Sequence, residues 1–251
     1  LTCPEGAVSG GVRGERENGE VPRSRSARPR RRRVTKRRRL GLAMTSVVAL
    51  ALIAVATIGF VQRFDATHGE AAPLDDRVVT TTGEPDETPP DPACLNDVPA
   101  SQPKRIALPS IDVTGCMQRV GIDDENRIAT PSNLHVAGWF VDSPLPGTVT
   151  SDVSIVVGHQ TGKYVGGIFD HLDDIADGDE FSIEMGDGSE RTFRVTDVAT
   201  HSAAETMPAV YADAAATGST LALITCSGPF DRGIDQRRDR LVVLAVDASA
   251  A

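Results

Sequence analysis

The most informative stretch of this chain is Thr220-Leu221-Ala222-Leu223-Ile224-Thr225-Cys226-Ser227-Gly228-Pro229-Phe230-Asp231. Its apolar run, residues 221–224, is typical of a buried strand. The run ends in Thr-Cys, and the Gly-Pro pair predicts a turn immediately afterwards. A strand that stops there places the thiol of Cys226 at the rim of a sheet, where a substrate can reach it.

Strand patterns dominate the sequence on both sides of this stretch. Short apolar or alternating runs bounded by Gly and Pro predict strands at 105–108, 111–113, 134–140, 152–159, 180–185, 192–198, 220–225 and 241–246. Helical patterns are weak and fall at 167–175 and 209–216. Seven or eight short strands with one or two short helices predict an all-β barrel or sandwich over residues 104–247.

Charge and hydropathy divide the rest of the chain into three parts. Residues 1–39 hold 13 of the 26 Lys and Arg and four of the 35 Asp and Glu, a composition that predicts a basic, disordered tail. Residues 40–61 form an uncharged run of 22, about 33 Å as a helix, which predicts a single transmembrane anchor. Residues 62–103 carry seven prolines and nine acidic residues and predict an extended, self-repelling spacer.

The flanks of the apolar run predict the topology. Nine basic residues lie within 28–39 and only Arg63 follows closely, so the N-terminus is expected in the cytoplasm and residues 62–251 outside, on the plasma membrane. A cleaved signal peptide is the alternative. The run is longer than the usual apolar region of about 7–15 residues and no Ala-x-Ala follows directly, which favours the anchor. No aromatic residues interleave the basic tract, so no nucleic-acid partner is expected.

Four cysteines constrain the chemistry: Cys3, Cys94, Cys116 and Cys226. Three of them lie on the expected exterior, where disulfides persist. An odd number suggests one pair and one reactive thiol. A disulfide between Cys94 and Cys116 would close a loop and stabilise the folded state by about 3 kcal/mol. It would leave Cys226 as the remaining thiol. No zinc-type spacing occurs, so neither a metal nor a cofactor is expected.

Two further residue types can assist a cysteine nucleophile. His159 follows the apolar run 155–158 and begins a loop. Catalytic side chains often lie at such positions, where a loop leaves a rigid strand. An imidazole there could stabilise a thiolate and later protonate a leaving amine. His135 lies within an alternating strand and is expected to be structural. Arg237, Arg238 and Arg240 precede the predicted last strand, and one of them could hydrogen bond an oxyanion.

These motifs resemble those of a known family. Leu223-Ile224-Thr225-Cys226 resembles the Leu-x-Thr-Cys signature of sortases, the membrane-anchored transpeptidases of Gram-positive bacteria. The extension to Asp231 is similar to the actinobacterial class F branch, as are Ala137-Gly138-Trp139-Phe140 and Val157-Gly158-His159. The resemblance covers about residues 104–247.

The resemblance implies an eight-stranded β-barrel and a definite reaction. Cys226 would attack the Thr–Gly bond of a Leu-Pro-x-Thr-Gly type sorting signal on a secreted protein and form a thioester. An amine of a cell-wall peptidoglycan precursor or a pilin would resolve it. His159 would be the general acid and base. Arg238 best matches the family arginine, because Arg237-Arg238-Asp239-Arg240 stands where that branch has Tyr-Arg-Asp-Asn. Arg240 is the alternative.

Two other functions fit the same residues. A catalytically silent, membrane-tethered module could bind sorting-signal peptides, with Cys226 as a buried core residue. A Cys-His hydrolase would release the acyl group to water instead of to an amine. The sorting signal, the amine acceptor and the choice between pilus assembly and anchoring of single proteins are not specified by these motifs.

Overall fold

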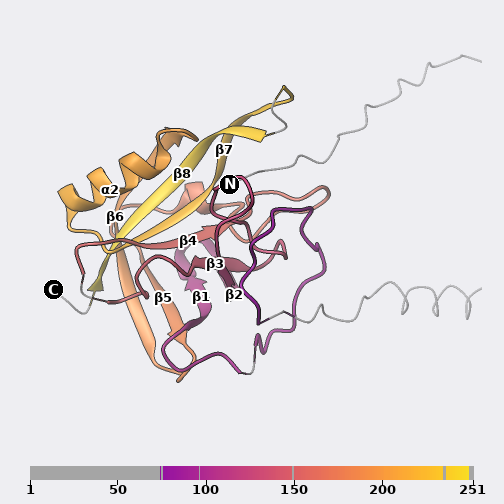
Figure 1. The fold of residues 1–251 in the computed structure, drawn as a ribbon. Coiled ribbons are helices and arrows are strands. Elements are labelled where there is room, and N and C mark those ends of the chain that lie inside the picture. Colours follow the sequence, from indigo (N-terminus) through magenta and orange to yellow (C-terminus); the bar gives the residue numbers. More distant parts are fainter. Residues whose placement is uncertain (1–73, 75, 96, 149, 234–235, 249–251) are drawn as a thin grey trace, which may run out of the picture. The chain divides into compact units, whose positions relative to one another are not determined.

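Eight strands form one closed barrel in the computed structural model, which describes residues 74, 76–95, 97–148, 150–233 and 236–248 (Figure 1). Their order around the barrel is β1-β2-β3-β4-β7-β8-β6-β5. Only the β2–β3 and β4–β7 pairs are parallel. The strands are β1 (Pro103–Leu108), β2 (Val113–Val120), β3 (Ala137–Phe140), β4 (Ser154–Gly158), β5 (Glu180–Met185), β6 (Glu190–Ser202), β7 (Leu221–Asp231) and β8 (Gln236–Asp247). The expected all-β barrel is therefore confirmed.

Helical structure is sparse in the described residues. α2 (Thr206–Thr217) replaces the helix predicted at 209–216, and it ends at Gly218, whose positive φ of 74° suits a glycine. The predicted helix at 167–175 is reduced to a short 3₁₀ helix, Leu172–Asp174, and another spans Pro109–Ile111. No helix in this part of the chain has the length and apolar character of a bilayer span. The predicted tail at 1–39 and anchor at 40–61 lie outside the described residues.

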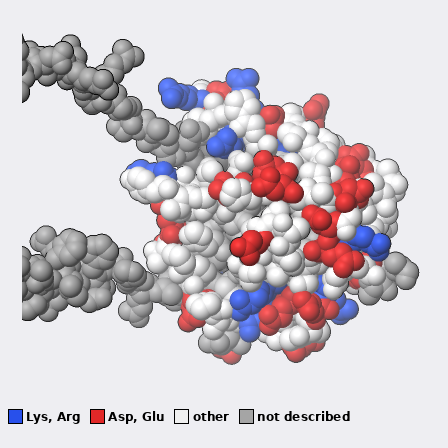
Figure 2. Space-filling view, turned by 180° about the vertical axis from the view of Figure 1, so that it is seen from behind, with Lys and Arg blue, Asp and Glu red and all other residues white. Residues whose placement is uncertain are grey.

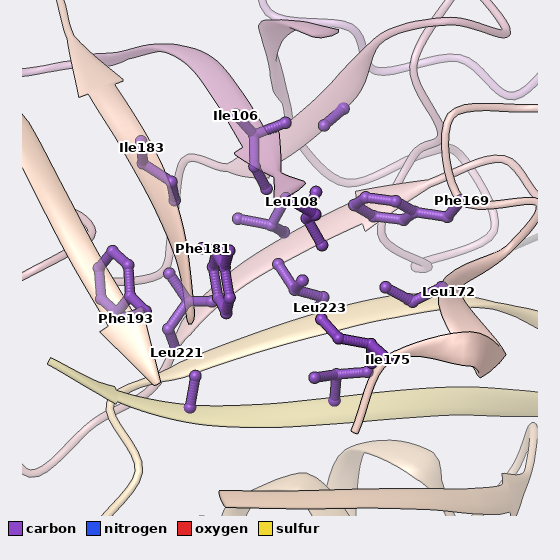
Figure 3. Packing of buried hydrophobic residues seen from close by; sticks show 14 of the residues in the cluster. Ile106, Leu108, Phe169, Leu172, Ile175, Phe181, Ile183, Phe193, Leu221 and Leu223 are labelled. Atoms are coloured by element: carbon purple, nitrogen blue, oxygen red, sulfur yellow. The ribbon is translucent and has the colours of Figure 1, made fainter. Parts of the chain in front are cut away.

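Successive side chains along each strand point to opposite faces of the barrel, and apolar residues form a layer on each face. The barrel interior receives side chains from all eight strands, including Ile106, Phe181, Phe193, Leu221 and Leu223 (Figure 3). Phe181 and Phe193 stack with ring centroids 5.5 Å apart, and burying each such ring contributes about 1.5–3 kcal/mol. A second cluster lies on the outer face of β4, β7 and β8. Val210 and Ala214 of α2 cover this cluster. In Figure 1, helix α2 lies beside β6 and β8.

The strands at the C-terminal end are longer than the sequence predicts. β7 continues past Cys226 to Asp231 instead of stopping at a turn, and an irregularity in the pairing between Ser227 and Phe230 accommodates the extra residues. Gly228 lies in this bulge with a φ of 73°. The prediction failed because Gly and Pro mark bulges in long strands as well as turns. β8 correspondingly begins at Gln236, so all three arginines lie within it.

The acidic Pro-rich segment lies against the barrel in its described part, whereas the sequence predicts a spacer. We call residues 76–95 the strap; it runs beside β2 and β3 in Figure 1. Val79 forms a parallel bridge with Val120, and Asp86 forms one with Asn133. Proline and acidic residues prevent a regular strand, but they leave single backbone groups able to pair with exposed strand edges.

A disulfide fixes the end of the strap. Cys94 and Cys116 are bonded, with their Cα atoms 5.4 Å apart, as the sequence suggested. The bond joins the strap to β2 and packs with Val136 in a small buried cluster. The strap is therefore attached to the barrel by covalent and backbone bonds.

Acidic side chains outnumber basic ones on one face of the molecule. Figure 2, which shows the molecule from behind, has many red Asp and Glu side chains and fewer blue Lys and Arg. This agrees with the sequence after residue 39, which holds 31 acidic and 13 basic residues. Such a surface repels polyanions.

Candidate active site

Three neighbouring strands carry the candidate residues at one end of the outer face. On that face the side chains of Val157, Ile224 and Val242 belong to one apolar cluster. Val157 pairs with Ile224, and Ile224 pairs with Val242. Since alternate residues of a strand share a face, the side chains two positions further along lie on the same face. Those positions are His159, Cys226 and Arg240.

Cys226 lies between the other two residues. It is directly opposite Arg240 in the antiparallel β7–β8 pair, where Cβ atoms are about 4.5–5.5 Å apart. The parallel β4–β7 register ends at Val157 and Ile224, and His159 is the first residue after β4. The Thr225 hydroxyl donates to the Gly158 carbonyl at 2.9 Å, which holds the two strand ends together. The structure therefore pairs Cys226 with Arg240, and His159 follows the end of β4, the strand next to β7.

His159 is buried, with 4% of its surface exposed, and its ring orientation is fixed. Nε2 donates a hydrogen bond of 2.8 Å to the carbonyl of Pro131. This leaves Nδ1 of the neutral ring as the basic nitrogen. Burial lowers the pKa of His159 below its ordinary value, and the Pro131 carbonyl works in the opposite direction by favouring the charged ring. The ring is therefore neutral at neutral pH and able to take a proton.

Arg240 is the arginine that faces the cysteine. It is 3% exposed, and its Nη1 donates to the carbonyls of Arg237 at 2.9 Å and Asp239 at 2.8 Å. Burial lowers the pKa of the guanidinium, Asp239 raises it, and nearby Arg127 lowers it. Arginine nevertheless stays charged in proteins, so a fixed cation lies next to Cys226.

Arg238 has a different environment. Its side chain is 64% exposed, and it forms an ion pair with Asp231 through Nη2 at 2.7 Å and Nε at 2.9 Å. It stands opposite the bulge of β7 instead of opposite Cys226. The resemblance favours Arg238, whereas the register favours Arg240, the alternative named above. The sequence could not distinguish them because the choice depends on where β8 begins and how the bulge shifts the pairing.

Cys226 is only 2% exposed and is disulfide-bonded in the structure. The expectation that it is the odd, unpaired thiol is therefore not met. That expectation counted only the three cysteines on one side of a predicted membrane span, and the fourth, Cys3, lies outside the described residues. Nucleophilic chemistry at Cys226 requires the reduced side chain, because only a thiolate attacks.

A pocket of about 600 Å³ adjoins this row of residues. Arg240 and Ile224 line it, which places it on the face that Cys226 shares. Its other walls are mainly apolar and include Ile122, Ile128, Phe140, Met207 and Tyr211. This volume and composition are typical of sites that bind small molecules or short peptide segments. The alternating patterns in the sequence did not predict the pocket, because loop 121–128 and α2 form it together with β7 and β8.

The other histidines in the described part of the chain lie elsewhere. Nε2 of His135 donates to the Glu87 carbonyl at 3.1 Å, which agrees with a structural role. His201 lies 3.6 Å from a carboxylate oxygen of Asp213. Within the described part of the chain, no three His, Cys, Asp or Glu side chains are grouped so that they could hold a metal ion.

Solved structures similar to this one are sortases. Sortase C-1 from Actinomyces oris is 23% identical, with 58% of this chain and 72% of that chain covered and a TM-score of 0.40. Sortase A from Corynebacterium diphtheriae, as a lid mutant, is 22% identical, with 60% and 70% covered and a TM-score of 0.43. Sortase C1 from Streptococcus agalactiae is 20% identical, with 58% and 66% covered and a TM-score of 0.42.

A search among curated proteins found no significant match. The sortase-domain family model, in contrast, matches residues 106–248, which is more than half of the chain and nearly the whole barrel. The match includes β7 and β8, which carry Cys226 and Arg240, and His159, which follows β4. The chain therefore belongs to the sortase family, whose members are cysteine transpeptidases.

Proposed function

We propose that this chain is a class F sortase that cleaves a Leu-Pro-x-Thr-Gly type sorting signal and transfers the acyl group to an amine. The observation that carries the proposal is the row His159, Cys226 and Arg240 on adjacent strands beside a largely apolar pocket. The class F assignment rests on the motif from Cys226 to Asp231 and on Ala137-Gly138-Trp139-Phe140.

The proposed reaction uses each of the three residues once per half-reaction. The reduced Cys226 thiol passes its proton to Nδ1 of His159, and the sulfur attacks the carbonyl carbon of the signal threonine. The Pro131 carbonyl then stabilises the imidazolium through Nε2–H. The Thr–Gly C–N bond breaks, the leaving amine takes the proton from His159, and a thioester remains.

The second half-reaction reverses these steps. An acceptor amine attacks the thioester carbonyl and gives its proton to His159, and the thiolate leaves. In both halves negative charge forms on the carbonyl oxygen. We assign the donor that stabilises this charge to Arg240 in preference to Arg238, because Arg240 is buried opposite the cysteine and Arg238 is already paired with Asp231.

The partners proposed are secreted proteins with C-terminal sorting signals and an amine of a peptidoglycan precursor or a pilin. We also propose that residues 40–61 anchor the chain in the plasma membrane with the barrel outside, on the charge pattern of the sequence. Proteolysis of the barrel in intact cells should occur without lysis, and complete protection until lysis would contradict this topology.

The test of the reaction is acyl capture by hydroxylamine. The reduced full chain, incubated with a sorting-signal peptide and hydroxylamine, should release the peptide hydroxamate. Cys226→Ala should abolish the product, while Ser227→Ala, which changes the adjacent residue on the opposite face of β7, should retain it. Product formation by Cys226→Ala at the parent rate would overturn the proposal.

The alternatives give different outcomes in the same assay. A silent binding module would bind the peptide, for example in a fluorescence polarisation titration, without releasing product. A hydrolase would release the free acid at the same rate with and without an acceptor amine. Transfer product that grows with amine concentration at the expense of the acid would support the transpeptidase.

A further inference from the structure

The strap contacts both parts of the molecule that hold His159. The first is the segment around Pro131, whose carbonyl orients the imidazole. The second is the loop of residues 160–167, which continues the chain directly from His159. One strap residue, Glu87, bonds to the loop through its side chain and to the other segment through its backbone.

The segment after Pro131 is held from both sides. On the barrel side, the Gln118 side-chain oxygen accepts from the Ser132 amide at 3.1 Å and from its hydroxyl at 3.2 Å. On the outer side, the Asp86 amide donates to the Ser132 carbonyl at 2.9 Å, and the Leu134 amide donates to the Asp86 carbonyl at 2.8 Å. The carbonyl that orients His159 is thus attached to a segment that the strap clamps.

Two side chains of this segment return to the strap. The Asn133 amide group donates to the Thr88 carbonyl at 2.8 Å. His135 donates to the Glu87 carbonyl at 3.1 Å. Strap residues 86–88 therefore form backbone or side-chain bonds with all four residues that follow Pro131, so a displaced strap would remove the outer support of the segment that carries the Pro131 carbonyl.

The loop after His159 is a tight hairpin that closes over Glu87. The Gly167 amide donates to the Gln160 carbonyl at 2.7 Å, and Thr161 bridges Gly166. At its tip, the backbone amides of Lys163 and Tyr164 both donate to Oε1 of Glu87. Charge-assisted bonds of this kind are about twice as strong as neutral ones.

Glycine at position 162 permits this approach. A Cβ atom at Gly162 would lie 2.4 Å from Oε1 of Glu87 and 2.6 Å from a methyl group of Leu134. The hairpin therefore passes within contact distance of both the strap carboxylate and the segment after Pro131. Any other side chain at 162 would displace one of them.

From these contacts we infer that Glu87 is a positioning residue of the transpeptidase site, which holds His159 in line with Cys226 through the 160–167 hairpin and the Pro131 segment. The inference rests on the proposed role of His159. It assigns a function in the reaction to a segment whose composition predicts only a spacer. Glu87 itself does not contact the reacting atoms.

The experiment uses the reduced full chain and three substitutions. Glu87→Ala removes the acceptor for the two hairpin amides. Glu87→Gln keeps an oxygen acceptor at the same place without the charge. Glu84→Ala removes an exposed strap carboxylate for which the structure shows no hydrogen bond, and it controls for the loss of charge.

Glu87→Ala should lower kcat for peptide transfer by about 10-fold to 100-fold, the usual cost of misplacing a catalytic group, with KM for the peptide little changed. Glu87→Gln should restore most of kcat, and Glu84→Ala should match the parent. The second readout is the Nε2–H proton of His159 in ¹⁵N-histidine NMR spectra, identified by its loss in His159→Ala. It should exchange with water faster in Glu87→Ala only.

The two readouts separate the possible failures. If Glu87→Ala lowers the unfolding midpoint but leaves kcat and the His159 signal at the parent values, Glu87 is merely structural and the inference is overturned. If the parent itself shows no Cys226-dependent turnover, the proposed function fails, and the His159 signal still reports whether Glu87 orients the ring.

Discussion

At the scale of single residues, the site depends on alternation and register. His159 and Cys226 could be proposed from the sequence because each ends an apolar run, and the period of two along β7 places Cys226 on the same face as Ile224. The arginine could not be selected in this way. Arg238 and Arg240 are two positions apart, so the alternation of a strand places both on the same face. Only the pairing with β7 shows that Arg240 stands opposite Cys226.

This difference predicts opposite outcomes for two matched substitutions. Arg240→Lys should reduce kcat by about 100-fold to 1000-fold, as loss of an oxyanion donor does, because lysine cannot reproduce the fixed guanidinium fork. Arg238→Lys changes an exposed ion pair worth about 0–1 kcal/mol and should leave kcat within about threefold of the parent.

Hydroxamate formation under saturating peptide measures both variants. Thermal unfolding of each variant should show that the fold is retained. A large loss of kcat for Arg238→Lys with a parent-like Arg240→Lys would reverse the assignment and restore the choice that the resemblance favours.

At the scale of elements, the bulge in β7 sets the register on which the site depends. Gly228 has a φ of 73°, and a Cβ atom there would lie 2.2 Å from a carboxylate oxygen of Asp239, the residue next to Arg240. The Gly228 carbonyl also accepts from Nη1 of Arg237 at 2.8 Å. The Gly-Pro pair that predicted a turn thus permits a continuous strand pair in which Cys226 meets Arg240.

Gly228→Ala should therefore impair both stability and turnover. The left-handed backbone costs an alanine about 1–2 kcal/mol, and the contact with Asp239 adds to this. Gly188→Ala is the matched control, because Gly188 has a φ of 81° but open space around its Cα. Urea unfolding should show a loss for both variants, with turnover reduced only for Gly228→Ala. Equal turnover in the two variants would show that the bulge does not determine the arrangement of Cys226 and Arg240.

The strap is the element that sequence patterns described least well. Its prolines and acidic residues correctly exclude a helix or a central strand, and the described part contains only isolated bridges. Composition cannot reveal that single backbone groups at Val79 and Asp86 pair with the barrel. Such pairing depends on edges that β2 and the segment after Pro131 expose only in the folded molecule.

At the scale of the whole molecule, the barrel and the strap are joined by the bond between Cys94 and Cys116. The two cysteines are 22 residues apart in sequence, and closing a loop of that size stabilises the fold by about 3 kcal/mol in the chain-entropy model. Replacing both cysteines by serine should lower the free energy of unfolding by about 2–4 kcal/mol.

The measurement is urea unfolding of the full chain in a Cys226→Ala background, so that the disulfide at Cys226 does not contribute. Addition of reductant to the Cys226→Ala chain should reproduce the effect of the double serine variant. An unchanged midpoint in both experiments would show that the backbone bonds of the strap suffice without the disulfide.

The order of strands around the barrel has a consequence for the timing of activity. β7, which carries Cys226, pairs with β4 from the middle of the domain and with β8 at its end. The cysteine thus meets His159 and Arg240 only when both of those strands have docked, and a partly synthesised chain holds a thiol without its partners. Completion of the sheet is thereby the step that assembles the proposed site, and turnover then requires only that Cys226 be in its reduced form.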